Sequence, residues 1–128
     1  MKVFAYGTLK SEHGNNRILS SSRFVKEATI FRAKLYYSYG NGSFPVAKFT
    51  EGNDTIVGEI WDISGPNMES TLQRLDMLEG VPTMYTRETA VTDCGEQVHL
   101  YIGSPRTFDF SRMTEVTLNL NNQYEWSR

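Results

Sequence analysis

Two stretches of this 128-residue chain carry groups that could do chemistry, and the first is Tyr6-Gly7-Thr8-Leu9. It follows the apolar run Val3-Phe4-Ala5, whose residue types are typical of a buried strand. A glycine at the end of such a strand adopts backbone angles closed to other residues and lets a ligand approach. The N–H groups of residues 7–9 would then lack strand partners, and such a row of amides can bind a carboxylate or an oxyanion. An ordinary glycine turn after a strand explains the same residues.

The second stretch carries the carboxyl group of Glu79. An apolar pattern at spacings of three and four predicts an amphipathic helix over residues 67–78, formed by Met68, Thr71, Leu72, Leu75 and Leu78. Gly80 and Pro82 end it. In a cleft at the end of this helix, desolvation and the negative helix end would both raise the pKa of the carboxyl group. A carboxyl group whose pKa lies near neutrality suits general acid–base catalysis. On an open surface, Glu79 would simply be a solvated residue before a glycine.

The usual nucleophilic and metal-binding patterns are missing from the sequence. There is no Gly-x-Ser-x-Gly motif, and Cys94 lies in a predicted polar turn rather than at a helix start. His13 and His99 are far apart and have no Cys or His neighbour at ligand spacing. We therefore expect neither a metal nor another cofactor.

Length and composition limit the class of protein further. A chain of 128 residues is the size of one domain, and a net charge of −2 gives no global attraction to nucleic acid or anionic membranes. No apolar run approaches the ~20 residues of a membrane-spanning helix, and the first run breaks at Gly7, unlike a signal peptide. Because Cys94 is the single cysteine, no internal disulfide can form. We expect a cytoplasmic protein with no nucleic-acid or membrane partner.

The rest of the pattern predicts mainly strands. Besides the first strand and the helix, the expected elements are a short helix within 17–22, one or two strands over 24–39, and strands over 44–47, 56–63, 84–92 and 98–102. Turns are expected at 40–42, 52–54 and 93–95, and Pro45 places its segment at an edge or bulge. Residues 103–128 either add a strand near 114–120 or wrap the body as an extended tail. One clear helix among many strands predicts an α+β domain on a curved or closed sheet.

Taken together, the two stretches and the segments between them resemble the γ-glutamylcyclotransferase-like family. The matching pieces, in order, are Tyr6-Gly7-Thr8-Leu9 with Lys10, Asn15, Arg17 and Leu19; Phe44-Pro45-Val46; Val57-Gly58-Glu59-Ile60-Trp61; and Leu75-Asp76 through Glu79-Gly80 with Pro82, Tyr85 and Arg87. Tyr101 falls where the last core strand of the family usually carries an aromatic residue. The resemblance covers about residues 2–103. Glu12 and His13 replace a Gly-containing turn, and the C-terminal extension 103–128 has no counterpart.

The resemblance implies a small mixed β-barrel of about five to seven strands, with one main helix and short helices packed around it, as a single domain over residues 1–128. In the family, the loop that matches residues Tyr6, Gly7, Thr8 and Leu9 binds a γ-glutamyl group through backbone amides, and the acid–base residue falls on Glu79. Tyr85, Tyr101 and Pro45 are further candidates for substrate contacts, although buried Tyr hydroxyls also find partners for purely structural reasons. The short chain and Thr8 resemble the γ-glutamylamine cyclotransferase branch.

The implied activity is cleavage of a γ-glutamyl amide by its own α-amine, which gives 5-oxoproline and a free amine, with a monomer or weak homodimer as the expected assembly. Glu79 would take a proton from the α-ammonium and deliver it to the departing amine. An alternative on the same fold is a non-catalytic module that binds a γ-glutamyl-like or other acidic small molecule. A further alternative is an interaction domain whose aromatic tail (Phe108, Phe110, Tyr124 and Trp126) docks on another subunit.

Overall fold

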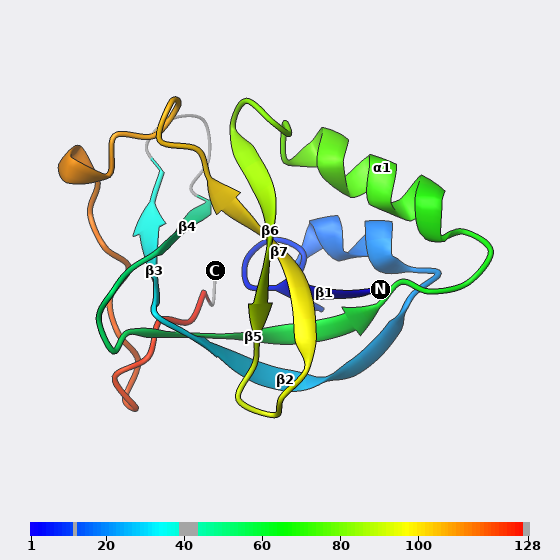
Figure 1. Cartoon of the computed structure of the whole chain (residues 1–128), viewed down its shortest axis with the longest axis horizontal. Helices are drawn as coiled ribbons and strands as arrows, with labels where there is room; N and C mark the ends of the chain where they lie inside the picture. Colours follow the sequence, from blue (N-terminus) through cyan, green and yellow to red (C-terminus); the bar gives the residue numbers. More distant parts are fainter. Residues whose placement is uncertain (12, 39–43, 127–128) are drawn as a thin grey trace.

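The computed structural model describes residues 1–11, 13–38 and 44–126, and it has an α+β architecture (Figure 1). In these residues the strands are β1 Lys2–Ala5, β2 Arg23–Phe31, β3 Ala33–Tyr37, β4 Pro45–Phe49, β5 Thr55–Asp62, β6 Tyr85–Val91 and β7 Gln97–Gly103. The α-helix is α1 Met68–Leu78, and η1 Gly14–Leu19 and η2 Phe110–Arg112 are short 3₁₀ helices. The predicted α+β class is confirmed. The expected turn at 40–42 lies outside the described residues.

Five strands form the main sheet in the order β2-β5-β1-β7-β6. The β1–β7 pair is parallel and the other neighbours are antiparallel, so the sheet is mixed. The sheet curls until its two edges meet, where Ile30 of β2 forms an isolated bridge with Thr92 just after β6. Beside this bridge, the backbone N–H of Asp93 donates to the carbonyl of Thr29 at 2.9 Å. The predicted barrel is thus a curled sheet that a short contact closes, rather than a continuous ladder.

The predicted strand region 24–39 is two strands that belong to different sheets. Arg32 separates β2 from β3 with a φ of 57°, a left-handed conformation that redirects the chain. Beyond it, β3 pairs with β4 as a two-stranded sheet, in which Tyr37 lies opposite Pro45. Pro45 therefore begins an edge strand, where the missing N–H is tolerated. This bend carries β4 to the end of β1, next to the candidate loop.

Helix α1 lies within one residue of its predicted bounds, and the other predicted helix is shifted toward the N-terminus as η1. Leu75 of α1 and Leu19 of η1 are both fully buried in one apolar cluster with Val3 and Trp61 of the sheet. In Figure 1, α1 and η1 lie side by side on one side of the molecule. At 11 residues, α1 is far too short to span a bilayer, and no helix in the described part is long and apolar enough to do so. The helix is instead a packing element that ends at the candidate site.

Residues 104–126 wrap the body as an extended tail, and the alternative strand near 114–120 does not form. The tail leaves β7, passes outside β3 and turns back under the sheets (orange to red in Figure 1). The N–H of Val116 donates to the carbonyl of Leu35 at 2.8 Å. The side chains of Val116, Tyr124 and Trp126 are buried in the main core. Tyr124 and Trp126 therefore complete the chain's own core and are not available to dock on a second subunit.

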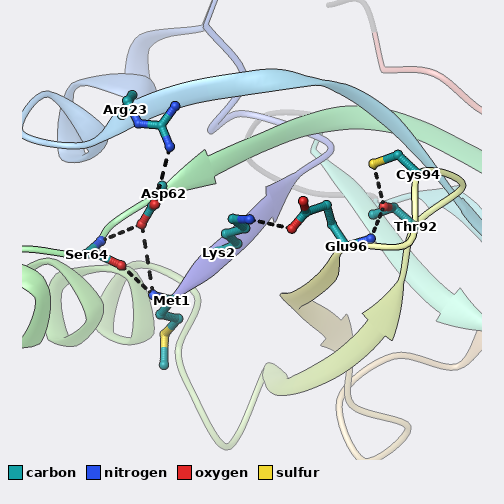
Figure 2. Close-up of polar contacts among 8 residues, drawn as sticks. All are labelled: Met1, Lys2, Arg23, Asp62, Ser64, Thr92, Cys94 and Glu96. Atoms are coloured by element: carbon teal, nitrogen blue, oxygen red, sulfur yellow. Dashed lines mark hydrogen bonds and ion pairs between the residues drawn. The ribbon is translucent and has the colours of Figure 1, made fainter.

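Ionic contacts tie the start of β1 to two other parts of the sheet, as Figure 2 shows. Lys2 pairs with Glu96 in the β6–β7 turn. Asp62 at the end of β5 pairs with Arg23 at 3.5 Å and accepts a hydrogen bond from the N–H of Ser64 at 2.9 Å. Exposed pairs of this kind contribute little to stability. Burial of the apolar clusters is therefore the main source of stability, and the ammonium group of Met1, 4.0 Å from Asp62, and the Lys2–Glu96 pair add contacts at the start of β1.

Candidate active site

A single cavity collects the residues that the sequence singled out. Its walls are the end of β1, the loop that follows β1, the start of β4, the end of α1, and β6 and β7; the lining residues are Phe4, Tyr6, Gly7, Thr8, Leu9, Phe44, Pro45, Glu79, Tyr85 and Tyr101. All eight candidate site residues thus face one cavity, whose volume is about 40 Å³. Their roles remain predictions. Phe4 and Phe44 complete the lining. Neither was predicted as a site residue, although Phe44 lies in the matching piece Phe44-Pro45-Val46, because an apolar residue is usually part of the core.

The loop after β1 is held in place without use of the N–H groups of residues 7–9. The side-chain amide of Asn15 donates to Thr8 Oγ1 at 3.0 Å, and that of Asn16 donates to the carbonyl of Leu9 at 2.7 Å. Across the described chain, none of the N–H groups of residues 7–9 donates to a protein acceptor. Three amides next to a cavity and without partners are ready to bind an anionic or carbonyl oxygen.

Gly7 is required by a neighbour rather than by its backbone angles. A Cβ added to Gly7 would lie 2.6 Å from Cγ of Pro45, closer than two carbon atoms can approach. Glycine is thus needed at position 7, but not for the predicted reason of an unusual backbone conformation. The ring of Pro45 occupies the space that a side chain would need. The pair Gly7–Pro45 sets the width of the cavity at this end.

Glu59 fixes the far end of the loop, a role that the sequence did not reveal. It is 7% exposed, yet its carboxylate accepts hydrogen bonds from the N–H and the hydroxyl of Ser11, both at 2.7 Å. The indole N–H of Trp61 also donates to it, at 3.2 Å. A buried carboxylate with several donors is well satisfied. Because Ser11 follows Leu9 by two residues, Glu59 anchors the loop to β5.

Glu79 immediately follows α1, and its N–H closes the last turn by donation to the carbonyl of Leu75 at 3.0 Å. Its carboxyl group faces the cavity from among protein atoms, and this burial raises the pKa of Glu79 to about 7. Within the described residues, no side chain or backbone group forms a hydrogen bond or ion pair with this carboxyl group. A carboxyl group that is desolvated, unpaired and half ionised near pH 7 can both take and give a proton.

Three phenols surround Glu79, and each donates its proton to the protein. Tyr6 donates to the carbonyl of Tyr101 at 2.5 Å, and Tyr85 donates to the carbonyl of Pro45 at 3.1 Å. Tyr101 donates to the carboxylate of Asp76 at 2.7 Å. Burial raises the pKa of all three phenols well above the usual value, and the charge of the nearby carboxyl adds to the shift. These hydroxyls stay neutral, and toward the cavity their oxygens can only accept.

Asp76 and Arg87 form a second polar pair behind Tyr101. Arg87 Nη1 donates to both carboxylate oxygens of Asp76, at 2.9 and 3.1 Å, and thereby joins β6 to α1. Asp76 precedes Glu79 by three residues, so the two carboxyl groups project from one face of the helix end. The i, i+3 spacing was the available sequence signal for this arrangement. The pair explains why this part of the chain carries Leu75-Asp76, Tyr85 and Arg87 as a block.

The cavity is lined by both donors and acceptors. The loop after β1 offers the amides of residues 7–9 as donors, and Glu79 offers an acceptor together with the phenol oxygens of Tyr85 and Tyr101. This distribution suits a small zwitterion that carries both a carboxylate and an ammonium group. In the described part of the chain, no three His, Cys, Asp or Glu side chains gather as metal ligands.

The curled mixed sheet, together with a cavity at the end of its first strand, defines a small α+β protein with a candidate active site at that end. The chain belongs to the family described as gamma-glutamyl cyclotransferase, AIG2-like, whose model matches residues 3–125. The matched range includes the tail up to residue 125, so the expectation that the C-terminal extension has no counterpart in the family was wrong.

Individual relatives agree with this assignment. The Escherichia coli K12 protein YtfP, named as a gamma-glutamylcyclotransferase family protein, is 30% identical over 95 residues, which are 74% of this chain and 76% of YtfP. A Vibrio cholerae protein that is provisionally named a gamma-glutamylcyclotransferase is 35% identical over 94 residues, 73% of this chain and 74% of that protein. The crystal structure of a mouse AIG2-like protein superposes with a TM-score of 0.67 at 19% identity, over 99% of this chain and 95% of that one. The last comparison establishes a shared fold.

Proposed function

We propose that this protein is a γ-glutamyl cyclotransferase, which converts a γ-glutamyl amide into 5-oxoproline and a free amine. The observation that carries this proposal is the carboxyl group of Glu79, which faces the cavity without a partner and has a pKa of about 7. The unpartnered amides of residues 7–9 and membership of the family support it.

Substrate binding follows from the donors and acceptors that line the cavity. The N–H groups of residues 7–9 hold the α-carboxylate of the γ-glutamyl group. The α-ammonium lies against Glu79 and the phenol oxygens of Tyr85 and Tyr101. Holding both ends in the small cavity curls the γ-glutamyl chain, which brings the α-nitrogen to the γ-carbonyl. Positioning of this kind can contribute up to ~7–11 kcal/mol to the reaction.

The reaction then needs one proton shuttle and no nucleophile from the protein. The Glu79 carboxylate takes a proton from the α-ammonium, and the freed amine forms a C–N bond to the γ-carbonyl carbon. The resulting tetrahedral oxyanion is stabilised by nearby N–H donors. When the original amide C–N bond breaks, the neutral Glu79 carboxyl returns its proton to the departing amine. The ring nitrogen then loses its second proton through the same carboxylate to the departing amine, so the products are the neutral five-membered lactam of 5-oxoproline and an ammonium ion, and Glu79 is again a carboxylate.

The alternative of a non-catalytic module that binds acidic ligands is disfavoured by the same residue. A site built only for anions would gain nothing from an unpaired carboxyl group beside oxygen acceptors, because like charge weakens anion binding.

Replacement of Glu79 by Gln tests the proposal. Glu79→Gln keeps the size of the side chain and removes the proton shuttle, so 5-oxoproline production from a panel of γ-glutamyl amides should fall by at least ~10²-fold. The matched control is Glu69→Gln, which changes an exposed Glu in the first turn of the same helix and should retain full activity. Mass spectrometry of 5-oxoproline gives the readout, and undiminished activity of Glu79→Gln would overturn the assignment.

A further inference from the structure

A second hollow on the surface lies next to the candidate active site. We call it the tail groove, and its lining residues are Ser38, Phe44, Met84, Thr107, Phe108, Asp109, Arg112 and Met113. The tail supplies most of one wall, and Met84, just before β6, supplies the other. The volume of the tail groove is about 420 Å³, about ten times that of the active-site cavity at about 40 Å³. Of the two hollows, the tail groove has more room for the leaving half of a substrate.

Three observations place the tail groove next to the cavity. Phe44 lines both. The rings of Tyr85 in the cavity and Phe108 in the groove meet edge to face, with centroids 5.6 Å apart. The side chain of Met84 packs against Gly80, 3.3 Å from where a Cβ of that residue would lie. Because Gly80 directly follows Glu79, the groove begins beside the proton donor for the departing amine.

The wall that the tail contributes is held by backbone hydrogen bonds. The N–H of Ser104 donates to the carbonyl of Met84 at 2.8 Å, and the N–H of Phe108 donates back to the carbonyl of Ser104 at 2.9 Å. The hydroxyl of Thr107 donates to the carbonyl of Thr83 at 2.6 Å. These bonds hold segment 104–108 against Thr83 and Met84, so this part of the groove is preformed.

The side chains that line the tail groove are mainly apolar, and its two charged residues pair with each other. Two aromatic rings and two thioethers supply its side walls. The charged residues Asp109 and Arg112 pair with each other at 3.6 Å, and Asp109 also accepts from the N–H and hydroxyl of Ser111. Among the described lining residues, no charged side chain is unpaired, and an apolar stem is the ligand that gains most from entering the groove.

We propose that the tail groove binds the leaving half of the substrate and makes the enzyme selective for γ-glutamyl amides of amines with long aliphatic or aromatic stems. This proposal rests on the proposed function, since it extends the same site. Methionine suits such a surface because its flexible, polarisable side chain adapts to stems of different shape.

A series of γ-glutamyl amides tests the selectivity. The amines are methylamine, butylamine, hexylamine and phenylethylamine, and kcat/KM is measured by release of 5-oxoproline. We expect kcat/KM to rise roughly twofold to fourfold for each methylene that the groove buries. In parallel, calorimetry measures the affinity of the methyl and phenylethyl amides for the Glu79→Gln variant, which binds without turnover.

Met84→Gln is the diagnostic variant, since it keeps the length of the side chain and makes it polar. It should reduce the preference for the phenylethyl over the methyl amide by about fivefold or more, in kcat/KM and in affinity. The matched control is Met77→Gln, because Met77 is 81% exposed and is absent from the lining of both cavities. This control should keep the preference of the parent protein.

The outcomes separate the two proposals. Turnover of all amides with equal kcat/KM and equal affinity would overturn the groove and leave the cyclotransferase function intact. Absence of 5-oxoproline from every amide, together with tighter binding of the phenylethyl amide that Met84→Gln weakens, would overturn the function and support the groove. Equal binding of the methyl and phenylethyl amides to Glu79→Gln rules out the groove whether or not the parent enzyme turns them over.

Discussion

Tyr101 donates its hydroxyl proton to Asp76 at 2.7 Å, away from the cavity that its ring lines. Asp76 is a carboxylate paired with Arg87 and can only accept, so the direction of this hydrogen bond is fixed. In the proposed reaction, the phenol oxygen is thereby kept as an acceptor for the α-ammonium of the substrate. Asp76 would then act on the substrate through Tyr101, as a positioning residue.

A double-mutant cycle tests this arrangement. Tyr101→Phe removes the acceptor, and we expect KM to rise about threefold to tenfold with a smaller change in kcat. Asp76→Ala lets the Tyr101 hydroxyl turn toward the cavity and should raise KM similarly. If Asp76 acts through Tyr101, Asp76→Ala adds little further effect in the Tyr101→Phe background. Fully additive effects of the two substitutions on KM would contradict the positioning role. Asp76→Asn retains an acceptor oxygen and should restore part of the lost affinity.

The rate of the reaction should depend on pH through Glu79. The carboxylate is the base form, so kcat/KM should fall about tenfold per pH unit as the pH drops below about 7. The phenols that surround Glu79 (Tyr6, Tyr85 and Tyr101) have raised pKa values and stay neutral across this range. The acid limb therefore reports Glu79 in the free enzyme. A pH profile that stays flat down to pH 5 would exclude Glu79 as the base.

Stability should depend on pH with the opposite sense to activity. Burial raises the pKa of Glu79 from 4.5 to about 7, so between these values the folded protein binds more protons than the unfolded chain. The contribution of Glu79 to the free energy of unfolding therefore falls by up to about 3 kcal/mol as the pH rises from about 4.5 to about 7. Above pH 7 this contribution no longer changes. Glu79→Gln lacks this loss, so the variant should become more stable than the parent protein above pH 7. Urea unfolding of both proteins at pH 5 and pH 8 checks the sign, and an identical difference at the two values would contradict it.

The contact between Gly7 and Pro45 predicts a sensitive position. A methyl group at residue 7 would overlap Pro45 Cγ at 2.6 Å, so Gly7→Ala should cost about 1–3 kcal/mol of stability and displace the loop amides, with loss of activity. Gly14→Ala is the matched control, because a Cβ there meets nothing within 4 Å. Adding Pro45→Ala to Gly7→Ala frees the space and should recover part of the stability in thermal unfolding. No recovery in the double variant would mean that another contact makes Gly7 necessary.

Sequence reasoning worked best where the cause of a structure is local. The spacing of leucines gave α1 to within one residue, and the alternation over 56–63 matches β5 at Thr55–Asp62. The site residues were found because their order along the chain resembles a family pattern. The break at Arg32 was not predicted, since a left-handed arginine has no residue-specific signal and is stabilised by surrounding structure.

The features missed in the site all depend on contacts between distant segments. Glu59 and Ser11 are 48 residues apart, and Tyr101 and Asp76 are 25 apart, so neither hydrogen bond follows from a local pattern. The burial of Trp126 was equally hidden, because the weak alternation in the tail does not distinguish a surface strap from a core segment. Such contacts appear only once the sheet has brought the segments together.

The wall that residues 107–113 build has a consequence for how a protein of this architecture can diversify. The loop amides come from the first strand and Glu79 comes from the helix end, whereas the surface next to them comes from the chain after β7. Substitutions or changes of length in residues 107–113 can therefore remodel the neighbouring surface while the proton shuttle and the anion-binding amides stay fixed. Substitutions in the tail could then change which leaving amine is preferred, while the residues proposed to carry out the reaction stay the same.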